Sequence, residues 1–196
     1  MTVPDGAEQD AAWVAIDVPL PPSRLAEFCL DVERLYRINP YLEFRRWHAT
    51  AEGAEVAFRN LSNGREFEAA FTFVPLSEFE FAVRYDRGIK RETRFRMEPH
   101  VHGSHLVITD VYRAGPRPDL AEVDRSLHAW GTALREYLER EARWGRSRIW
   151  RWYMRRVWVP MKPSARRITY IILAVTLAEI ALLALVMAIY WAERSG

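Results

Sequence analysis

Asp110 and Arg91 are the two ionisable residues that the sequence places among apolar side chains. Asp110 falls in the alternating apolar pattern of Ser104–Arg113, and Arg91 falls in a similar pattern over Ile89–Glu98. Alternate residues of a β-strand point to the same face of a sheet, so both groups are expected on an apolar face. A carboxylate buried there requires a cation or a donor, and an arginine supplies both. We therefore expect the two side chains to lie close together.

Pairing of these two strands defines a candidate ligand site. An antiparallel hairpin that turns near residues 99–104 places Asp110 opposite Thr93 and diagonally near Arg91. With Tyr112 on the same face, the four residues form a patch that could hold the polar group of a ligand. Two alternatives stay open at this point. The ion pair could have a structural role only, or a bulge could turn Asp110 outward.

Other reactive side chains give weaker patterns. His100, His102 and His105 are closely spaced in PHVHGSH, but they fall in an expected loop between two strands. Cys29 is the only cysteine, which excludes a disulfide within the chain, and its apolar helical surroundings favour packing over nucleophilic chemistry. No catalytic triad order, glycine-rich phosphate loop or pair of catalytic carboxylates stands out. The sequence therefore predicts no metal and no cofactor at these residues, and it does not favour an enzyme.

Seven strand-like segments and one long helix must position the candidate site. A helical stretch, Arg24 to about Tyr36, follows the first strand, and a long helix with an apolar stripe opens at Pro118-Asp119. This element order predicts an α+β fold in which a seven-stranded antiparallel sheet wraps around the C-terminal helix. The expected strands are Ala12–Val18, Leu42–Thr50, Glu55–Asn60, Arg65–Val74, Glu78–Asp86, Ile89–Glu98 and Ser104–Arg113.

Phenylalanine is concentrated on one face of this sheet. If Asn63-Gly64 forms a two-residue turn and residues 86–88 form a three-residue loop, Phe58 faces Ala69 and Phe81 faces Thr93. The aromatic rings then share the face that carries the polar patch. A ligand cavity and a solid core are both compatible with this pattern. The expected apolar ligand contacts are Phe58, Phe71, Phe81, Phe95 and Trp130.

The order strand, short helices, six strands and long helix resembles the START-like superfamily. This helix-grip fold is shared by lipid-transfer START domains, Bet v 1, polyketide cyclases and the coenzyme Q-binding proteins. The resemblance covers about Ala12 to Glu141 and also rests on the phrases PPSRLAEFCLDVERLYRINPYL and GSHLVITDVYRAG. It implies a cavity between the curved sheet and the long helix, occupied by a lipid, a prenyl quinone or another apolar molecule.

The C-terminal region predicts one transmembrane helix. Ile168–Trp191 contains 24 residues and a single charged one, Glu179. A helix of this length spans about 36 Å, which is enough to cross a hydrocarbon core of roughly 30 Å. Tyr170 at one end, with Tyr190 and Trp191 at the other, provides the aromatic residues typical of membrane interfaces.

The distribution of basic residues predicts the orientation of this helix. Between Arg143 and Arg167 there are nine basic residues and no acidic one, whereas Arg194 is the only basic residue after the apolar segment. Positive charge favours the cytoplasmic side, so we expect a single-pass protein of the inner (cytoplasmic) membrane with its N-terminal domain in the cytoplasm. Met1–Ala12 is polar and acidic, and is not expected to act as a signal peptide.

The segment 142–163 interleaves arginine with tryptophan. Tryptophan favours the membrane interface, and arginine can bind lipid phosphates. The same interleaving suits single-stranded nucleic acid, but the adjacent apolar helix favours lipid and not nucleic acid as the partner. The expected interface residues are Arg148, Trp150, Arg151, Trp152, Arg155 and Trp158.

Glu179 lies near the middle of the apolar segment, where a carboxyl group is costly if it faces lipid. Ala174, Ala178 and Ala181 form a stripe of small residues beside it, which allows another helix to approach closely. A transmembrane partner protein is therefore predicted to contact the helix at these four residues.

Composition fits a folded domain with an appendage, since 49% of the 196 residues are hydrophobic and 28% are charged. The expected parts are a flexible N-terminus (1–11), a START-like domain (12–141), an interfacial segment (142–163), a transmembrane helix (164–192) and a short tail (193–196). The expected function is a membrane-anchored START-like module that binds a lipid or quinone. The alternatives are an accessory subunit of a membrane complex, with the domain as a docking surface, and a cyclase- or hydrolase-type enzyme.

Overall fold

The computed structural model describes residues 11–113 and 120–195, so the expected flexible N-terminus and the helix start at Pro118-Asp119 lie outside the described residues. The chain forms two compact units, Met1–Pro160 and Met161–Gly196. The first unit holds a seven-stranded antiparallel sheet and the helices that cover it, as the α+β prediction requires.

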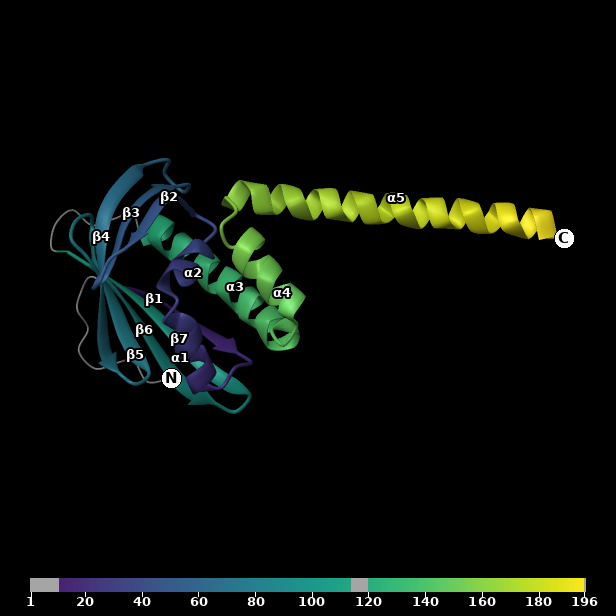
Figure 1. Ribbon diagram of the computed structural model, residues 1–196. Helices are drawn as coiled ribbons and strands as arrows, with labels where there is room; N and C mark the ends of the chain where they lie inside the picture. Colours follow the sequence, from purple (N-terminus) through teal and green to yellow (C-terminus); the bar gives the residue numbers. More distant parts are fainter. Residues whose placement is uncertain (1–10, 114–119, 196) are drawn as a thin grey trace. The chain divides into compact units, whose positions relative to one another are not determined.

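The strands lie in the order β1-β7-β6-β5-β4-β3-β2, so β1 and β2 form the two edges of the sheet. Figure 1 shows the sheet curving around α3, with α1 and α2 on the same concave side. This arrangement is the helix-grip fold. The strands are β1 (Ala11–Val18), β2 (Leu42–Ala49), β3 (Gly53–Asn60), β4 (Glu66–Ser77), β5 (Glu80–Tyr85), β6 (Lys90–His100) and β7 (Gly103–Tyr112).

The helical stretch after β1 is divided into α1 (Pro22–Cys29) and α2 (Val32–Arg37), where the sequence pattern predicts one continuous helix. Asp31 causes the division, because its side chain accepts a hydrogen bond from the backbone N–H of Arg34 at 3.2 Å and so starts a new helix. Both helices bury apolar residues against the inner face of the sheet.

The long helix α3 (Leu120–Trp144) packs closely on the edge strand β1. Gly131 allows this approach, because a Cβ atom there would lie 3.0 Å from a methyl group of Val14. The buried side of α3 consists of Leu127, Trp130, Leu134, Tyr137 and Leu138. The helix therefore closes the concave side of the sheet with large side chains.

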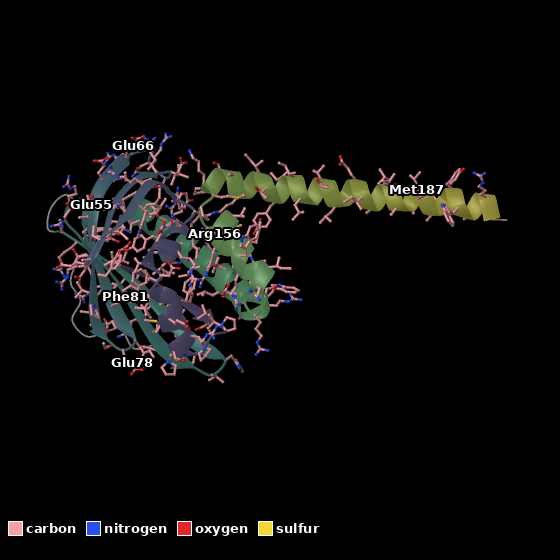
Figure 2. All side chains as sticks on the ribbon, viewed as in Figure 1. Glu55, Glu66, Glu78, Phe81, Arg156 and Met187 are labelled. Carbon is pink, nitrogen blue, oxygen red and sulfur yellow. The ribbon has the colours of Figure 1, made fainter. Side chains whose placement is uncertain are left out.

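The register of the strands differs from the prediction, although the phenylalanine side chains lie on the predicted face of the sheet. Phe58 lies opposite Phe67, and Phe81 lies opposite Phe95, each two residues from the predicted partner. The β3–β4 turn is a five-residue loop closed by a hydrogen bond from the Asn60 N–H to the Arg65 carbonyl at 2.8 Å. A shift of two residues keeps these phenylalanines on their predicted face, since strand side chains alternate with a period of two. Figure 2 shows the result: Glu55 and Glu66 lie on the outside of the sheet, and Phe81 lies on the helical side.

After α3 the first unit continues through α4 (Arg148–Tyr153) and the π-helical turn η1 (Met154–Trp158). Met154 and Val159 are buried in the core cluster of the domain. The compact unit therefore extends to Pro160, beyond the predicted end of the START-like domain at residue 141.

The second unit is a single helix, α5 (Pro163–Ser195). Its stretch Pro163–Ala192, 30 residues long with a mean hydropathy of 2.6, is long and apolar enough to cross a membrane. It is the one helix among the described residues that has this length and apolarity. Glu179 and the three alanines of the small-residue stripe lie on the exposed surface of α5.

Candidate functional site

Asp110 is the centre of a polar network on the inner face of the sheet. Its side chain is 1% exposed, although it carries an ionisable carboxyl group. The ammonium group of Lys90 lies 2.5 Å from Oδ2, and the Thr93 hydroxyl donates to Oδ1 at 2.6 Å. The predicted pairing of Thr93 with Asp110 across β6 and β7 is confirmed. Both carboxylate oxygens are therefore occupied inside the domain.

Two tyrosines extend the network away from Asp110. The Tyr85 hydroxyl lies 2.6 Å from the Thr93 hydroxyl, and the Tyr36 hydroxyl lies 2.6 Å from that of Tyr85. Because the single Thr93 proton is donated to Asp110, Tyr85 donates to Thr93, and Tyr36 in turn donates to Tyr85. The chain of hydrogen bonds thus runs from α2 through β5 and β6 and ends on the carboxylate.

The cation of this network is Lys90, and the prediction of Arg91 was wrong. Strand β6 has a bulge between Lys90 and Glu92, so Arg91 is the extra residue of the bulge. The Arg91 side chain is 46% exposed and approaches Glu92 on the outer face at 3.9 Å. The bulge places Lys90 on the inner face, opposite Tyr112, where Arg91 was predicted to lie.

Tyr112 provides a second buried hydroxyl group beside Asp110. The residue is buried beside Asp110 on β7, and no described residue forms a hydrogen bond to its Oη atom. Burial raises the pKa of Tyr112 above its ordinary value of 10.0, and the negative charge of Asp110 raises it further. The phenol is therefore protonated at neutral pH, and it can donate a hydrogen bond to a bound molecule.

Burial also raises the pKa of Tyr36 and of Tyr85 above 10.0. Burial raises the pKa of the Cys29 thiol to about 12. A thiol with this pKa is protonated at neutral pH, so Cys29 packs as an apolar residue and is not an activated nucleophile. His105 lies at the other end of β7, where its Nδ1 is 2.7 Å from Asp17 of β1, away from the network.

Aromatic rings surround the network. Phe95 stacks on Phe81 with ring centroids 4.7 Å apart and lies 5.7 Å from Trp130 in an edge-on arrangement. Phe71 lies 5.0 Å from the Tyr85 ring. The indole N–H of Trp130 donates to the Leu35 carbonyl at 3.2 Å, which fixes the ring between α2 and the sheet. The structure therefore brings together the predicted contacts Phe71, Phe81, Phe95 and Trp130.

Phe58 belongs to a second group of rings at the β2–β4 end of the sheet. Its ring lies 5.4 Å from Phe44 and 5.5 Å from Phe67, and Phe44 lies 5.2 Å from Trp47. These four rings are half-buried, whereas Phe71 and Phe95 are fully enclosed. The helices therefore leave this end of the inner face partly exposed.

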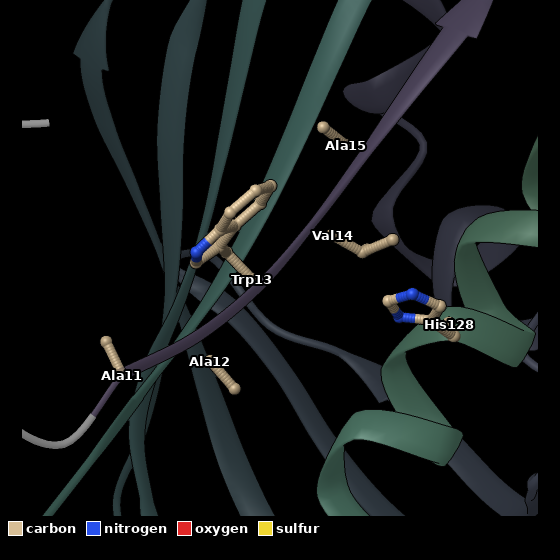
Figure 3. A pocket seen from close by; sticks show the side chains of 6 residues that line it. All are labelled: Ala11, Ala12, Trp13, Val14, Ala15 and His128. Atoms are coloured by element: carbon tan, nitrogen blue, oxygen red, sulfur yellow. The ribbon is translucent and has the colours of Figure 1, made fainter. Parts of the chain in front are cut away.

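Two surface hollows among the described residues lie outside this aromatic interior. One, of about 470 Å³, is an open groove along β1 and α3. Figure 3 shows Val14 and His128 on one side of β1 and the largely exposed Trp13 on the other. The second, of about 450 Å³, lies among α1, the end of α3 and the α4–η1 segment. The rings around Asp110 pack against one another, and neither hollow reaches them.

The predicted interface residues divide into two groups. Arg148, Arg151, Trp152 and Arg155 are exposed, whereas Trp150 and Trp158 are half-buried and pack against the domain core. Trp158 contacts Tyr137 with ring centroids 5.5 Å apart. The prediction placed all six side chains at an interface, but α4 and η1 turn two of the tryptophans toward the domain because that side of the segment is apolar.

Sequence reasoning missed Lys90 and Tyr36 as members of the network. Lys90 stands directly before Arg91, so the alternation alone could not decide which of two adjacent cations faces inward. Tyr36 is on a helix, and a strand pattern contains no information about its distance from Tyr85. Tyr85 itself follows the inner-face alternation of β5 and could have been included on that ground.

Comparison with known proteins supports the fold. No protein-family model and no curated protein sequence matches the chain. A START superfamily protein from Mycobacterium smegmatis is 16% identical with a TM-score of 0.52, over 66% of this chain and 97% of its own. The Zhui aromatase/cyclase from a Streptomyces species is 18% identical with a TM-score of 0.54, over 70% of this chain and 98% of its own. At these identities the likeness establishes the helix-grip fold of the START-like proteins.

Proposed function

We propose that this chain is a membrane-tethered START-like module that binds an apolar molecule, a lipid or a quinone, between the curved sheet and α3. The observation that carries the proposal is the buried network of Asp110. Replacing a buried ion pair by apolar residues of similar volume is often neutral or stabilising, so a core that only had to be stable would not need one. An ionised group on an otherwise aromatic face is suited to orient the polar end of an apolar ligand.

Tyr112 supports the same role. Buried hydroxyl groups almost always have a hydrogen-bond partner, and an unused donor beside a carboxylate requires an explanation. A carbonyl or hydroxyl oxygen of a ligand would satisfy it. The rings of Phe71, Phe81 and Phe95 would contact the apolar part of the same molecule.

Entry requires the interior to open, because the rings around the network pack against one another. Phe44, Trp47, Phe58 and Phe67 are half-buried at one end of the inner face, and we place the entrance there. The apolar helix α5 would tether the module to the bilayer that supplies the ligand, at the cytoplasmic membrane face.

The test compares two buried carboxylates on opposite faces of one strand pair. Asp110 lies on the inner face, and Glu92 is 4% exposed on the outer face. The full chain is extracted in mild detergent, and bound small molecules are identified by native mass spectrometry and solvent extraction. We expect wild type and Glu92→Gln to retain an apolar ligand that Asp110→Asn and Phe81→Arg lose, because the first removes the carboxylate and the second places a charge against the Phe95 ring. Absence of any extractable lipid or quinone from folded wild type contradicts the proposal.

One observation favours a second function, that of an accessory subunit of a membrane complex. Anchoring requires only apolar residues, so it does not account for Glu179 in the apolar stretch of α5. A partner helix that approaches along Ala174, Ala178 and Ala181 would account for it. Co-purification of a defined membrane protein in place of a ligand would favour this function.

A further inference from the structure

A basic hollow of about 450 Å³ lies among three helical segments of the first unit, away from the aromatic interior. Helix α1 contributes Arg24 and Glu27, and the C-terminal part of α3 contributes Glu141. These segments are more than a hundred residues apart in the sequence, so the hollow exists only in the folded domain. Its remaining wall comes from α4 and η1.

The wall formed by α4 and η1 is strongly basic. Arg151 is positioned by a hydrogen bond from its Nη1 to the Gly145 carbonyl at 3.2 Å. The π-helical turn buries Met154 and leaves the next two residues, Arg155 and Arg156, exposed along the hollow. Figure 2 shows Arg156 on this segment. A π-turn is uncommon and is frequently found at functional sites.

The charges and the aromatic rim of the hollow define the ligand that it suits. Four arginines and two glutamates line it, so its formal charge is +2 and favours an anion. Guanidinium groups match phosphate oxygens in a bidentate geometry. Trp152, which is 62% exposed, lies at the same wall and has an amphipathic ring typical of membrane interfaces.

We propose that this hollow binds the headgroup of an anionic phospholipid. Arg151, Arg155 and Arg156 bind the phosphate, and Glu27 and Glu141 accept hydrogen bonds from headgroup hydroxyls. The inference rests on the proposed membrane tether, because only a hollow held near the bilayer would bind the phosphate of a lipid and not a free anion. Arg156 precedes α5 by only seven residues, which span at most about 25 Å of extended chain. If α5 crosses the bilayer, the hollow cannot be far from lipid phosphates.

The experiment uses the full chain in a neutral detergent, with short-chain phosphatidylglycerol as the probe and native mass spectrometry to measure its dissociation constant. The triple variant Arg151→Gln, Arg155→Gln and Arg156→Gln should bind at least about tenfold more weakly than wild type. The matched control is Arg125→Gln, Arg143→Gln and Arg146→Gln, which removes the same charge from exposed arginines outside the hollow. We expect the control to bind within about threefold of wild type, since only non-specific attraction is lost.

Two further probes identify the source of the phosphate. Phosphatidylcholine or phosphatidylethanolamine binding as tightly as phosphatidylglycerol would overturn the assignment to an anionic headgroup. Displacement of phosphatidylglycerol by equimolar inorganic phosphate would assign the hollow to a free anion and overturn the lipid. Equal losses in the two triple variants would show that the hollow is not a site. The same spectra also report the ligand bound inside the sheet. If wild type retains that ligand but does not bind phosphatidylglycerol, this inference is rejected and the proposed function is not.

Discussion

The ammonium group of Lys90 lies 2.5 Å from a carboxylate oxygen of Asp110, a side chain that is otherwise enclosed by the sheet and the helices. Lys90 is 37% exposed, so its charge is partly solvated while that of Asp110 is not. The pair therefore connects the buried network to solvent at the end of β6. The energetic consequence is asymmetric, because removal of the cation leaves a buried charge with one donor, Thr93.

Replacing this cation should destabilise the domain. We expect Lys90→Met to lower the free energy of unfolding by about 2 kcal/mol, measured by urea denaturation of the detergent-solubilised protein. Arg91→Met is the matched control, because Arg91 is adjacent and exposed on the outer face, and it should change stability by no more than about 0.5 kcal/mol. The double variant Lys90→Met/Asp110→Asn should recover part of the loss. Equal effects of the two single variants would contradict the pairing.

Glu92 should give the domain an acid-sensitive contribution to stability. Burial raises the pKa of Glu92, but hydrogen bonds and charges of Arg94 and Arg84 outweigh it, so the pKa in the folded state is below its ordinary value of 4.5. A lowered pKa contributes stability above the unfolded-state pKa, and this contribution is lost as pH falls through the folded-state pKa. Glu92→Gln should therefore be less stable than wild type by about 1 kcal/mol at neutral pH, with a difference that shrinks below pH 4.5.

The control for this experiment is Glu98→Gln. Glu98 forms an exposed ion pair with Arg96 at 3.1 Å, which should contribute no more than about 0.5 kcal/mol at any pH. Unfolding curves at several pH values for the three proteins give the comparison. A constant difference between Glu92→Gln and wild type down to strongly acidic pH would show that the carboxylate charge is not responsible.

The orientation of the chain can be tested by proteolysis. Nine basic residues in Arg143–Arg167 precede the apolar segment of α5, and Arg194 alone follows it, so we expect the folded domain to be cytoplasmic. Protease added to sealed right-side-out vesicles should leave the domain intact, and the same protease should digest it after detergent is added. Digestion of the domain in the sealed vesicles would show that the chain has the opposite orientation.

Glu179 provides the test of a membrane partner. Glu179→Leu should improve insertion of the isolated helix while it weakens co-purification of a partner protein. Hydrogen bonds between helices in membranes average below about 1 kcal/mol, so the loss should be partial in mild detergent. Thr176→Leu, one turn away, removes a polar group without a charge and should leave co-purification unchanged. The same partners in the same yield from Glu179→Leu would remove the reason for a complex.

Local patterns determined much of this protein. The alternation of apolar residues in the strands set which side chains face α3. The composition of Ile168–Trp191 set a helix that is long and apolar enough to span a membrane. Both are properties of neighbouring residues: the two-residue repeat of a strand and the length of an apolar run depend on nothing distant. For this reason the inner position of Phe81 and Phe95 was predicted even though their partners were not.

Tertiary structure decided the register and the composition of the site. A bulge at Arg91 decides that Lys90, and not the adjacent Arg91, lies beside Asp110. The alternation of residues in the sequence does not predict this bulge, because it depends on the energy of packing across β6 and β7. Tyr36 joins the network only because α2 packs on the sheet at one particular distance. In the same way, Arg24 and Arg156 line one hollow through the packing of α1 against the end of α3 and η1. Contacts between distant segments depend on the whole core, and the sequence pattern of either segment alone does not encode them.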